Sequence, residues 1–240
     1  MGGSAIDCMR KNGIVSAISV AIAPEEYGSD RLNRQKGEIM KLFLTPGACS
    51  LSPHIALKEA GLPFDFEQVD LATKLTKSGA DYRKVNPKGS VPALELDNGQ
   101  ILTEGPAIVQ YIADQKPQSK LAPPAGSLER YRLQEWLNYT SSELHKKFGQ
   151  LFNPALTEDQ KKSTIAGIGT ELDFVNKSLA SKQFLVGDTF TVADAYMFVV
   201  LSWTKYFGID LGRWSVLKSY FDRIAARPSV KAAMQAEGLA

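Results

Sequence analysis

The 240-residue chain has 44% hydrophobic and 22% charged residues, proportions typical of a globular protein with one large core or two smaller ones. Its formal net charge of +2 comes without a basic block, which argues against nucleic acid or a membrane surface as a partner and favours small molecules. The longest apolar run, 195–201, is too short to cross a bilayer. Two cysteines, Cys8 and Cys49, predict no disulfide framework and favour a reducing, cytoplasmic compartment. With only two histidines, we expect no metal site.

Residues 1–39 have little hydrophobic periodicity and a single aromatic residue, and we interpret them as a disordered extension. A signal peptide is an alternative, because the basic residues 10–11 precede an apolar stretch, 13–23, that ends in small residues. Pro24 directly after this stretch weakens that alternative. We therefore expect the folded body to begin at Met40, with the preceding segment an upstream extension.

The next eighty residues alternate between short strand patterns and helix patterns. The expected elements are a strand at 41–45, a helix at 50–60, a strand at 64–69, a further helix near 74–82, strands at 91–96 and 100–103, and a helix from Pro106. Asp97-Asn98-Gly99 between the last two strands is a strong hairpin signal, because its residues tolerate positive φ. This order predicts a thioredoxin-like α/β domain with a mixed four-stranded sheet over residues 40–120.

A stiff connection at 116–126, rich in proline, precedes a segment that is helical throughout, so we predict an all-helical domain over 126–240. The helix expected at 127–152 has an apolar face formed by Leu133, Trp136, Leu137, Leu144, Phe148 and Leu151. At 3.6 residues per turn, Asn138, Ser142 and His145 fall on the opposite, polar side, with Asn138 and His145 nearly in line. This polar stripe is a candidate binding surface.

Two helix starts carry the pattern of a capping box, in which two side chains cap each other's backbone amides. Thr157 pairs with Gln160 in the first, and Thr191 pairs with Asp194 in the second. Both pairs are interpreted as folding devices. Asp194 is therefore not expected to be catalytic.

Several of these segments together resemble the bacterial beta-class glutathione transferases. The resemblance rests on 45–50 (TPGACS), 86–94 (NPKGSVPAL), 102–105 (LTEG), 135–139 (EWLNY), 143–146 (ELHK) and 190–196 (FTVADAY), and it runs from Met40 to the C-terminus. It implies glutathione as a cosubstrate in the cleft between the two domains, a small electrophilic second substrate, and a homodimer. The same resemblance identifies the site residues.

Cys49 is the first candidate catalytic residue. Its place between a strand and a helix N-terminus favours a thiolate, whereas a lone cysteine is more often a small buried hydrophobic residue. The resemblance implies that Cys49 contacts the glutathione sulfur and forms a mixed disulfide with it. His145 is the second candidate, expected to polarise or deprotonate that sulfur, although a satisfied or exposed histidine is the usual interpretation. His54 is interpreted as structural.

The remaining glutathione-binding candidates line the first domain and the polar stripe. Pro92 is expected to be cis, so that the backbone of Val91 pairs with the cysteinyl residue of glutathione; a simple edge-strand proline is the alternative. Glu104 and Gly105 at a helix N-terminus would hold the γ-glutamyl ammonium and carboxylate, while Glu104 also suits the helix dipole. Lys74 would face the glycyl carboxylate, or be an ordinary surface lysine. Asn138 and Ser142 complete the predicted set.

These residues predict a glutathione transferase that directs glutathione sulfur at an electrophile, with thiol–disulfide exchange through Cys49 as a second activity. Leu44 stands where many relatives carry a tyrosine, which puts fast conjugation of aromatic electrophiles in doubt. Alternatives are a glutathione-dependent reductase or dehalogenase, and a non-catalytic binding protein with the same fold. The last is disfavoured because the chain retains Cys49, Val91-Pro92, Glu104 and His145 together.

Overall fold

The computed structural model describes residues 39–239, so the expectations for residues 1–38, including the disordered extension and the signal peptide, lie outside the described residues. No helix of the described part is long and apolar enough to span a membrane. The strands and helices of its first half are β1 (Met40–Leu44), α2 (Leu51–Ala60), β2 (Phe64–Gln68), β3 (Ala93–Glu95), β4 (Ile101–Thr103) and α3 (Gly105–Gln115).

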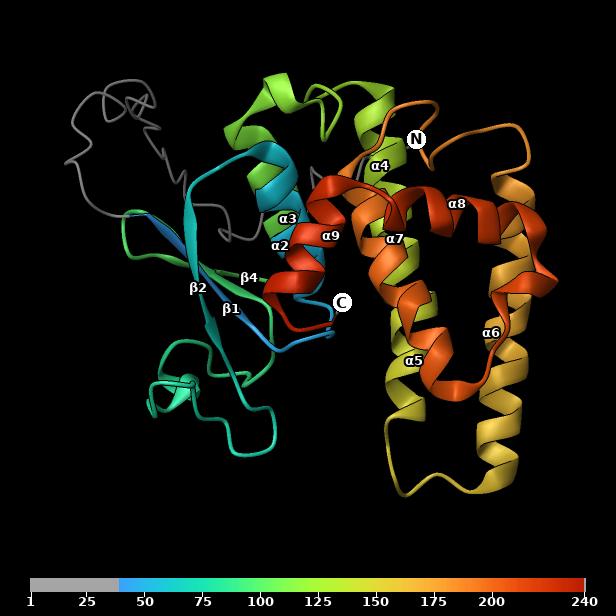
Figure 1. Cartoon of the computed structure of the whole chain (residues 1–240), viewed down its shortest axis with the longest axis horizontal. Coiled ribbons are helices and arrows are strands. Elements are labelled where there is room, and N and C mark those ends of the chain that lie inside the picture. Colours follow the sequence, from blue (N-terminus) through green and yellow to red (C-terminus); the bar gives the residue numbers. More distant parts are fainter. Residues whose placement is uncertain (1–38, 240) are drawn as a thin grey trace, which may run out of the picture. The chain divides into compact units, whose positions relative to one another are not determined.

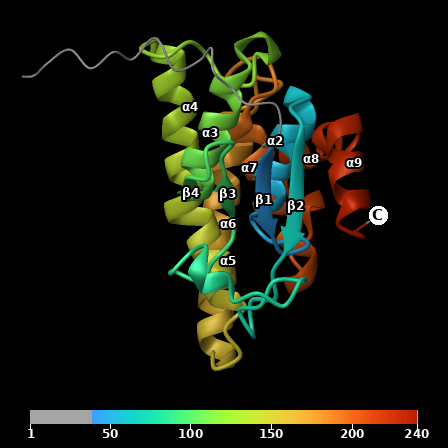
Figure 2. The same ribbon diagram turned by 90° about the vertical axis from the view of Figure 1, so that its left-hand side faces the viewer.

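The four strands form one mixed sheet in the order β2-β1-β3-β4. β1 pairs in parallel with β2 through the α2 crossover, and antiparallel with β3, which pairs with β4 across the predicted hairpin. The strands run side by side in Figure 2, and α3 packs against β3 and β4. The predicted thioredoxin-like domain with a mixed four-stranded sheet is therefore confirmed.

The alternation of side chains along β1 separates two cores. Leu42 and Leu44 are fully buried in the main core, on the face covered by α2 and α3. Phe43, between them, belongs to a small second core on the other face, where its ring lies 5.5 Å from that of Tyr82. The chain between β2 and β3, which carries Tyr82, thus covers the face that the helices leave open.

The helix expected near 74–82 is absent, and this prediction was wrong. The segment forms loops closed by two isolated bridges, Val69 with Thr76 and Leu75 with Asp81, followed by a single 3-10 turn at Tyr82–Lys84. The carboxylate of Asp70 accepts backbone N–H bonds two and three residues ahead, which favours a turn over a helix. Burial of Tyr82 then fixes the loop against the sheet.

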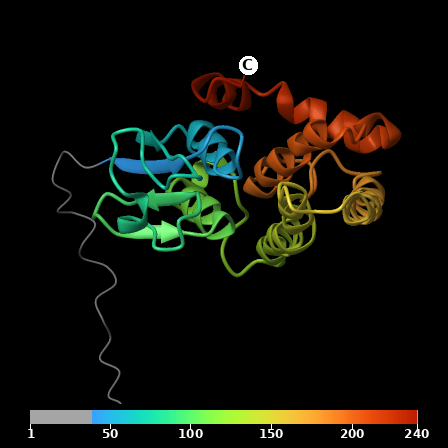
Figure 3. The same ribbon diagram turned by 90° about the horizontal axis from the view of Figure 1, so that it is seen from below.

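The second half of the described chain is helical, as predicted. Its elements are α4 (Leu128–Tyr139), a π-helical segment (Thr140–His145), α5 (Lys146–Leu151), α6 (Glu158–Ser178), α7 (Val192–Ser202), α8 (Ser215–Ala225) and α9 (Pro228–Ala236), with 3-10 turns at Pro117–Ser119, Trp203–Phe207 and Leu211–Arg213. Figure 3 shows the sheet on one side and this group of helices on the other. Both predicted capping boxes are present, at the starts of α6 and α7.

The sheet and the helices share one continuous core. α2 packs on the sheet and also against α7 and α9, which Figure 1 shows beside it. Leu42 of β1 and Val199 of α7 belong to the same buried cluster. The buried Asp194 carboxylate stabilises this region through the backbone N–H of Leu185 and the hydroxyl of Tyr220, in addition to its cap.

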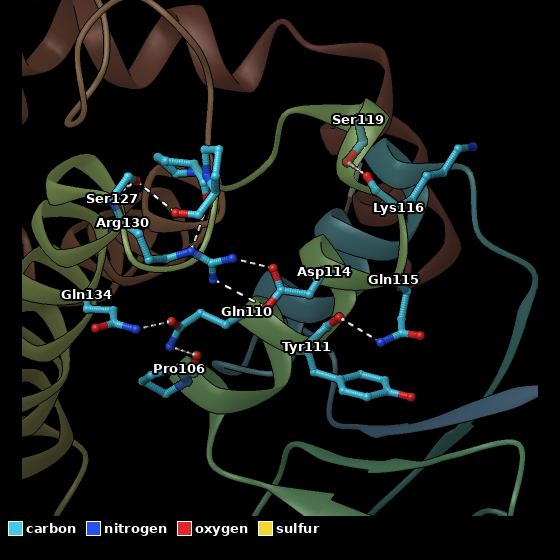
Figure 4. A network of polar contacts seen from close by, with 12 residues as sticks. Pro106, Gln110, Tyr111, Asp114, Gln115, Lys116, Ser119, Ser127, Arg130 and Gln134 are labelled. Atoms are coloured by element: carbon cyan, nitrogen blue, oxygen red, sulfur yellow. Dashed lines mark hydrogen bonds and ion pairs between the residues drawn. The ribbon is translucent and has the colours of Figure 1, made fainter. Parts of the chain in front are cut away.

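A polar network fastens the connection between the two halves (Figure 4). Arg130 in α4 is buried, donates to the Pro123 carbonyl at 2.8 Å and forms an ion pair with Asp114 at the end of α3. Beside it, Gln134 donates to Gln110 at 3.0 Å. The helices on either side of the proline-rich connection at 116–126 are thus joined to each other, and Arg130 also holds the connection itself.

Candidate active site

A cavity of about 630 Å³ contains Cys49 and lies where loops at one end of the sheet face the helical half. Its lining residues are Pro46, Gly47, Ala48, Cys49, Leu71, Lys74, Lys88, Gly89, Ser90, Val91, His145, Gly149, Phe152, Trp203 and Tyr206. The size falls within the ordinary range of small-molecule sites. Four of the predicted site residues meet here, namely Cys49, Lys74, Val91 and His145.

Cys49 precedes α2 and is only partly exposed. Its Sγ donates to the Val91 carbonyl at 3.2 Å, and the peptide bond between Val91 and Pro92 is cis, as predicted. Burial raises the pKa of the Cys49 thiol to about 12, and the charge of Glu104 adds to this, while the backbone amides of Cys49 and Ser50 act against it. The amides at the helix start therefore favour the thiolate, as expected, but burial outweighs them, so Cys49 is a thiol in the free protein.

His145 ends the π-helical segment and points its ring into the same region. Its Nδ1 lies 2.5 Å from the hydroxyl oxygen of Tyr196 in α7, and its ring packs at 4.9 Å from the ring of Trp203. Burial lowers the pKa of His145, so the imidazole is neutral at pH 7. Neither Tyr196 nor Trp203 was among the predicted site residues.

The π-helical segment explains why the predicted polar stripe is not realised. A π-turn joins residues five apart, so it winds less per residue than the α-helix on which the stripe was drawn. Asn138, before the segment, and His145, at its end, are consequently no longer in line. His145 lines the cavity, while Asn138 and Ser142 are exposed and lie outside the residues that line it.

Lysines form one wall of the cavity. Lys74 has a left-handed backbone (φ 61°), and its Nζ donates to the Gly89 carbonyl at 2.9 Å. Lys88 donates to Thr103 and forms an ion pair with Glu104. Glu104 is therefore linked to the cavity through Lys88. Pro92, Glu104 and Gly105 are not among the lining residues, and Cγ of Pro92 lies 3.8 Å from the Cβ position of Gly105.

Aromatic side chains form the opposite wall, and none of them was predicted. Phe152 at the end of α5 packs edge-on against Trp203, with ring centroids 5.9 Å apart, and Tyr206 follows in the same 3-10 turn as Trp203. Leu44, at the position where many relatives carry a tyrosine, is fully buried in the main core. The phenol groups near the cavity therefore belong to Tyr206, which lines it, and to Tyr196, which contacts His145, and not to β1. An irregular turn far along the chain carries no periodic signal that could have indicated this wall.

The loop before Cys49 is held from the C-terminal end of the chain. The carboxylate of Glu237 accepts the backbone N–H of Gly47 at 2.9 Å and pairs with Nδ1 of His54 at 2.8 Å, and both side chains are fully buried. Trp203 donates its indole N–H to the Gly47 carbonyl at 2.9 Å. His54 is thus structural, as predicted, and its Nε2 is the one buried side-chain N or O atom in residues 39–239 without a partner.

Comparison with known proteins decides the family. Two family models match, the glutathione S-transferase N-terminal domain over residues 47–115 and the C-terminal domain over residues 139–228. The chain belongs to the glutathione S-transferase family. Both matches fall inside the predicted domains 40–120 and 126–240, whose boundaries stay predictions.

Individual relatives extend the match over most of the chain. Glutathione S-transferase GstA of Escherichia coli O157:H7 is 46% identical over 200 residues, covering 83% of this chain and 100% of that one. A bacterial beta-class glutathione S-transferase of Sphingomonas chungbukensis is 50% identical with a TM-score of 0.81, and a sphingomonad glutathione S-transferase solved with glutathione gives the same two values. Each of these two covers 83% of this chain and 100% of its own. The resemblance to the beta class is confirmed.

Proposed function

We propose that this glutathione transferase binds glutathione against the lysine wall of the cavity and a small electrophile against the aromatic wall. The single observation that carries the proposal is that one cavity joins these two surfaces around Cys49 and His145. Glutathione has two carboxylates, which suit Lys74 and Lys88, and a peptide backbone, which suits Val91. Phe152, Trp203 and Tyr206 suit an apolar electrophile.

The neighbours of the lining residues supply the rest of the proposed glutathione site. Glu104 holds a backbone conformation (φ 70°) that is sparsely populated for residues other than glycine and costs about 1–3 kcal/mol. Such a cost is typical of residues that are fixed for function. We propose that Glu104 pairs with the glutathione ammonium and that the amide of Gly105, at the start of α3, meets the adjacent carboxylate.

In the proposed reaction the glutathione thiol loses its proton to solvent water, the resulting thiolate attacks the electrophilic carbon, and the leaving group departs with its electron pair. The cavity contributes orientation and partial exclusion of water, while the lysines offset the charge of the carboxylates. Conjugation does not consume Cys49. The neutral His145 and the Cys49 thiol are the titratable groups on the described chain that would lie nearest the sulfur.

Thiol–disulfide exchange is a second candidate function, favoured by the placement of the Cys49 sulfur inside the cavity. The thiolate of Cys49 would attack the glutathione sulfur of a mixed disulfide between glutathione and a substrate thiol, forming a disulfide with that sulfur and releasing the substrate thiolate. The thiolate of reduced glutathione would then attack the Cys49 mixed disulfide, releasing oxidised glutathione and regenerating the Cys49 thiolate. The raised pKa of Cys49 makes the first attack slow in the free protein. A substrate that lowers this pKa, or alkaline pH, should accelerate it.

The test uses the full chain with Cys8→Ala, so that Cys49 is its one thiol, beside the same protein with Cys49→Ala. Intact mass is measured after incubation with oxidised glutathione, followed by assays of conjugation and of disulfide reduction. We expect both proteins to catalyse conjugation. Only the protein that keeps Cys49 should form one glutathione adduct and reduce disulfides. Glutathione binding without turnover of any electrophile or disulfide would overturn the proposal in favour of a binding protein.

We further propose a cytoplasmic homodimer that detoxifies electrophiles. Leu128 and Tyr131 on α4 are 65% and 58% exposed, a large exposed apolar area for a free helix face. Because Asn138 and Ser142 lie outside the cavity of their own chain, a role in binding glutathione requires a second copy whose cavity meets this helix. Light scattering after size exclusion tests the dimer, and Tyr131→Glu should shift the protein toward the monomer.

A further inference from the structure

The tautomer of His145 follows from its contact with Tyr196. Tyr196 is 2% exposed, and its hydroxyl oxygen lies 2.5 Å from Nδ1 of His145, a distance that requires one hydrogen between the two atoms. The two rings meet nearly edge to face, at 78° and 5.8 Å, so the contact also fixes the orientation of the imidazole. The open question is which of the two atoms carries the hydrogen.

Acid–base matching assigns the hydrogen to the phenol. A phenol is a stronger acid than a neutral imidazole N–H, and a bare imidazole nitrogen is a much better acceptor than a phenol oxygen. Burial and the nearby sulfur of Cys49 raise the pKa of Tyr196 by more than its hydrogen bond with Ser141 lowers it, so its hydroxyl keeps its proton throughout the neutral range. The neutral imidazole of His145 then has its own hydrogen on Nε2.

Tyr196 occupies Nδ1 of His145 and so leaves Nε2 as the ring nitrogen available to a bound molecule. In residues 39–239, Nε2 of His54 is the one buried side-chain N or O atom that lacks a hydrogen-bond partner. Nε2 of His145 is therefore not a buried atom without a partner. His145 lines the cavity, and its recorded hydrogen bond is made by Nδ1. The atom presented to a bound molecule is therefore an N–H group.

We propose that Tyr196 is a positioning residue that holds His145 as the Nε2–H tautomer, so that His145 donates a hydrogen bond to negative charge in the cavity. Where the proposed function holds, that charge is the glutathione thiolate or an anion that develops on the electrophile. A donor stabilises this charge without taking up a proton. Of the two roles predicted for His145, polarising the sulfur is thus assigned, and deprotonating it is not.

The direct test needs no ligand and no activity. The full chain contains two histidines, so a protein labelled with ¹⁵N-histidine gives two sets of ring signals, which His145→Asn assigns. At a pH where His145 is neutral, we expect its Nε2 to show the shift of a protonated nitrogen and its Nδ1 that of a hydrogen-bonded acceptor. A protonated Nδ1 would overturn the inference, whatever the transferase assays give.

Variants then test the role of the phenol. Tyr196→Phe should leave His145 as a mixture of tautomers, raise its pKa, and lower kcat by about tenfold with little change in the KM for glutathione. This effect is smaller than the loss of about 10²–10³ that is typical when a donor is removed, because the variant keeps the Nε2–H tautomer in part of the molecules. Tyr206→Phe, which removes a cavity hydroxyl without contact to His145, should keep the single tautomer. An unchanged tautomer in Tyr196→Phe would contradict the assignment. Absent activity in the unmodified chain would instead contradict the proposed function alone.

Discussion

At the scale of single residues, the free protein keeps its sulfur as a thiol. The Cys49 thiol donates a hydrogen bond to the Val91 carbonyl. Burial raises its pKa from an ordinary value of 9.0 to about 12. The pKa of Cys49 is higher in the folded than in the unfolded protein. Its contribution to the free energy of unfolding is therefore fully present below about pH 9 and is lost as the pH rises toward 12. The low thiolate fraction limits reactivity at neutral pH.

Alkylation of Cys49 checks this state. In a Cys8→Ala protein, the rate with iodoacetamide should be slow at pH 7 and still rising above pH 9, where an ordinary thiol levels off. Glu104→Gln removes a charge that raises the pKa, so alkylation should accelerate by about twofold, part of the gain being offset by lower nucleophilicity. Glu135→Gln, an exposed change outside the cavity, is the control. A rate that levels off near pH 8 would contradict the raised pKa.

The aromatic wall makes a separate prediction. Phe152 is 53% exposed at the cavity, and Phe174 is 50% exposed on α6, outside it. Phe152→Ala should raise the KM for an aromatic electrophile by roughly fivefold, the equivalent of about 1 kcal/mol, and leave the KM for glutathione unchanged. Phe174→Ala should change neither. Equal effects of the two variants would place the electrophile elsewhere.

Sequence reasoning identified the residues whose chemistry is local. Cys49, Lys74, Val91 and His145 all line the cavity. Cys49 and Val91 stand at boundaries of elements that the pattern had located, whereas Lys74 lies in the segment whose predicted helix is absent and, like the role of His145, was identified through the family resemblance. It failed on the protonation of Cys49, since burial by distant segments cannot be read from the helix start. Tyr196 was missed as well, because it falls within a continuous apolar run in which every residue resembles core.

At the scale of elements, the C-terminal end of the chain supports the loop before Cys49. Glu237, just after α9, joins His54 in α2 to the backbone of Gly47. The pair is fully buried, so removing either partner leaves the other without compensation. The loop, α2 and the chain terminus therefore form one supporting unit.

Glu237→Ala should lower the free energy of unfolding by about 3–5 kcal/mol, because it leaves both His54 and the Gly47 amide unpaired in the interior. Urea denaturation measures the change. The matched control is Glu135→Ala, which breaks an ion pair with Arg132 whose side chains are each 61% exposed, and which should cost less than about 1 kcal/mol. Similar losses in the two variants would mean that the buried pair adds little.

Element boundaries were predicted best where caps mark them. α2 ends at Gly61, in the left-handed conformation, and α6 begins at the Thr157 capping box. The segment 74–82 carried no cap, and its conformation depends on the burial of Tyr82 against the sheet. The π-turn before His145 was invisible as well, because the residue pattern fits an unbroken α-helix.

At the scale of the whole described body, the continuous core predicts that the sheet and the helices unfold together. The three tryptophans, Trp136, Trp203 and Trp214, all report on the helical half, while alkylation of Cys49 in a Cys8→Ala protein reports on the sheet half. Their transitions in urea should coincide with each other and with far-ultraviolet circular dichroism. Cys49 exposure at a lower urea concentration than the fluorescence change would show two separate units.

The π-helical segment also affects how the chain tolerates changes of length. Removing one residue from an α-helix turns everything beyond it by about 100°. Inside Thr140–His145, a deletion can instead be absorbed when bonds between residues five apart tighten to four, which restores about the same rotation. Up to His145, the helix thus contains one residue more than an α-helix with the same total rotation would need. A relative one residue shorter at this point would still present that histidine to the thiol, and an alignment gap there does not mark a lost site.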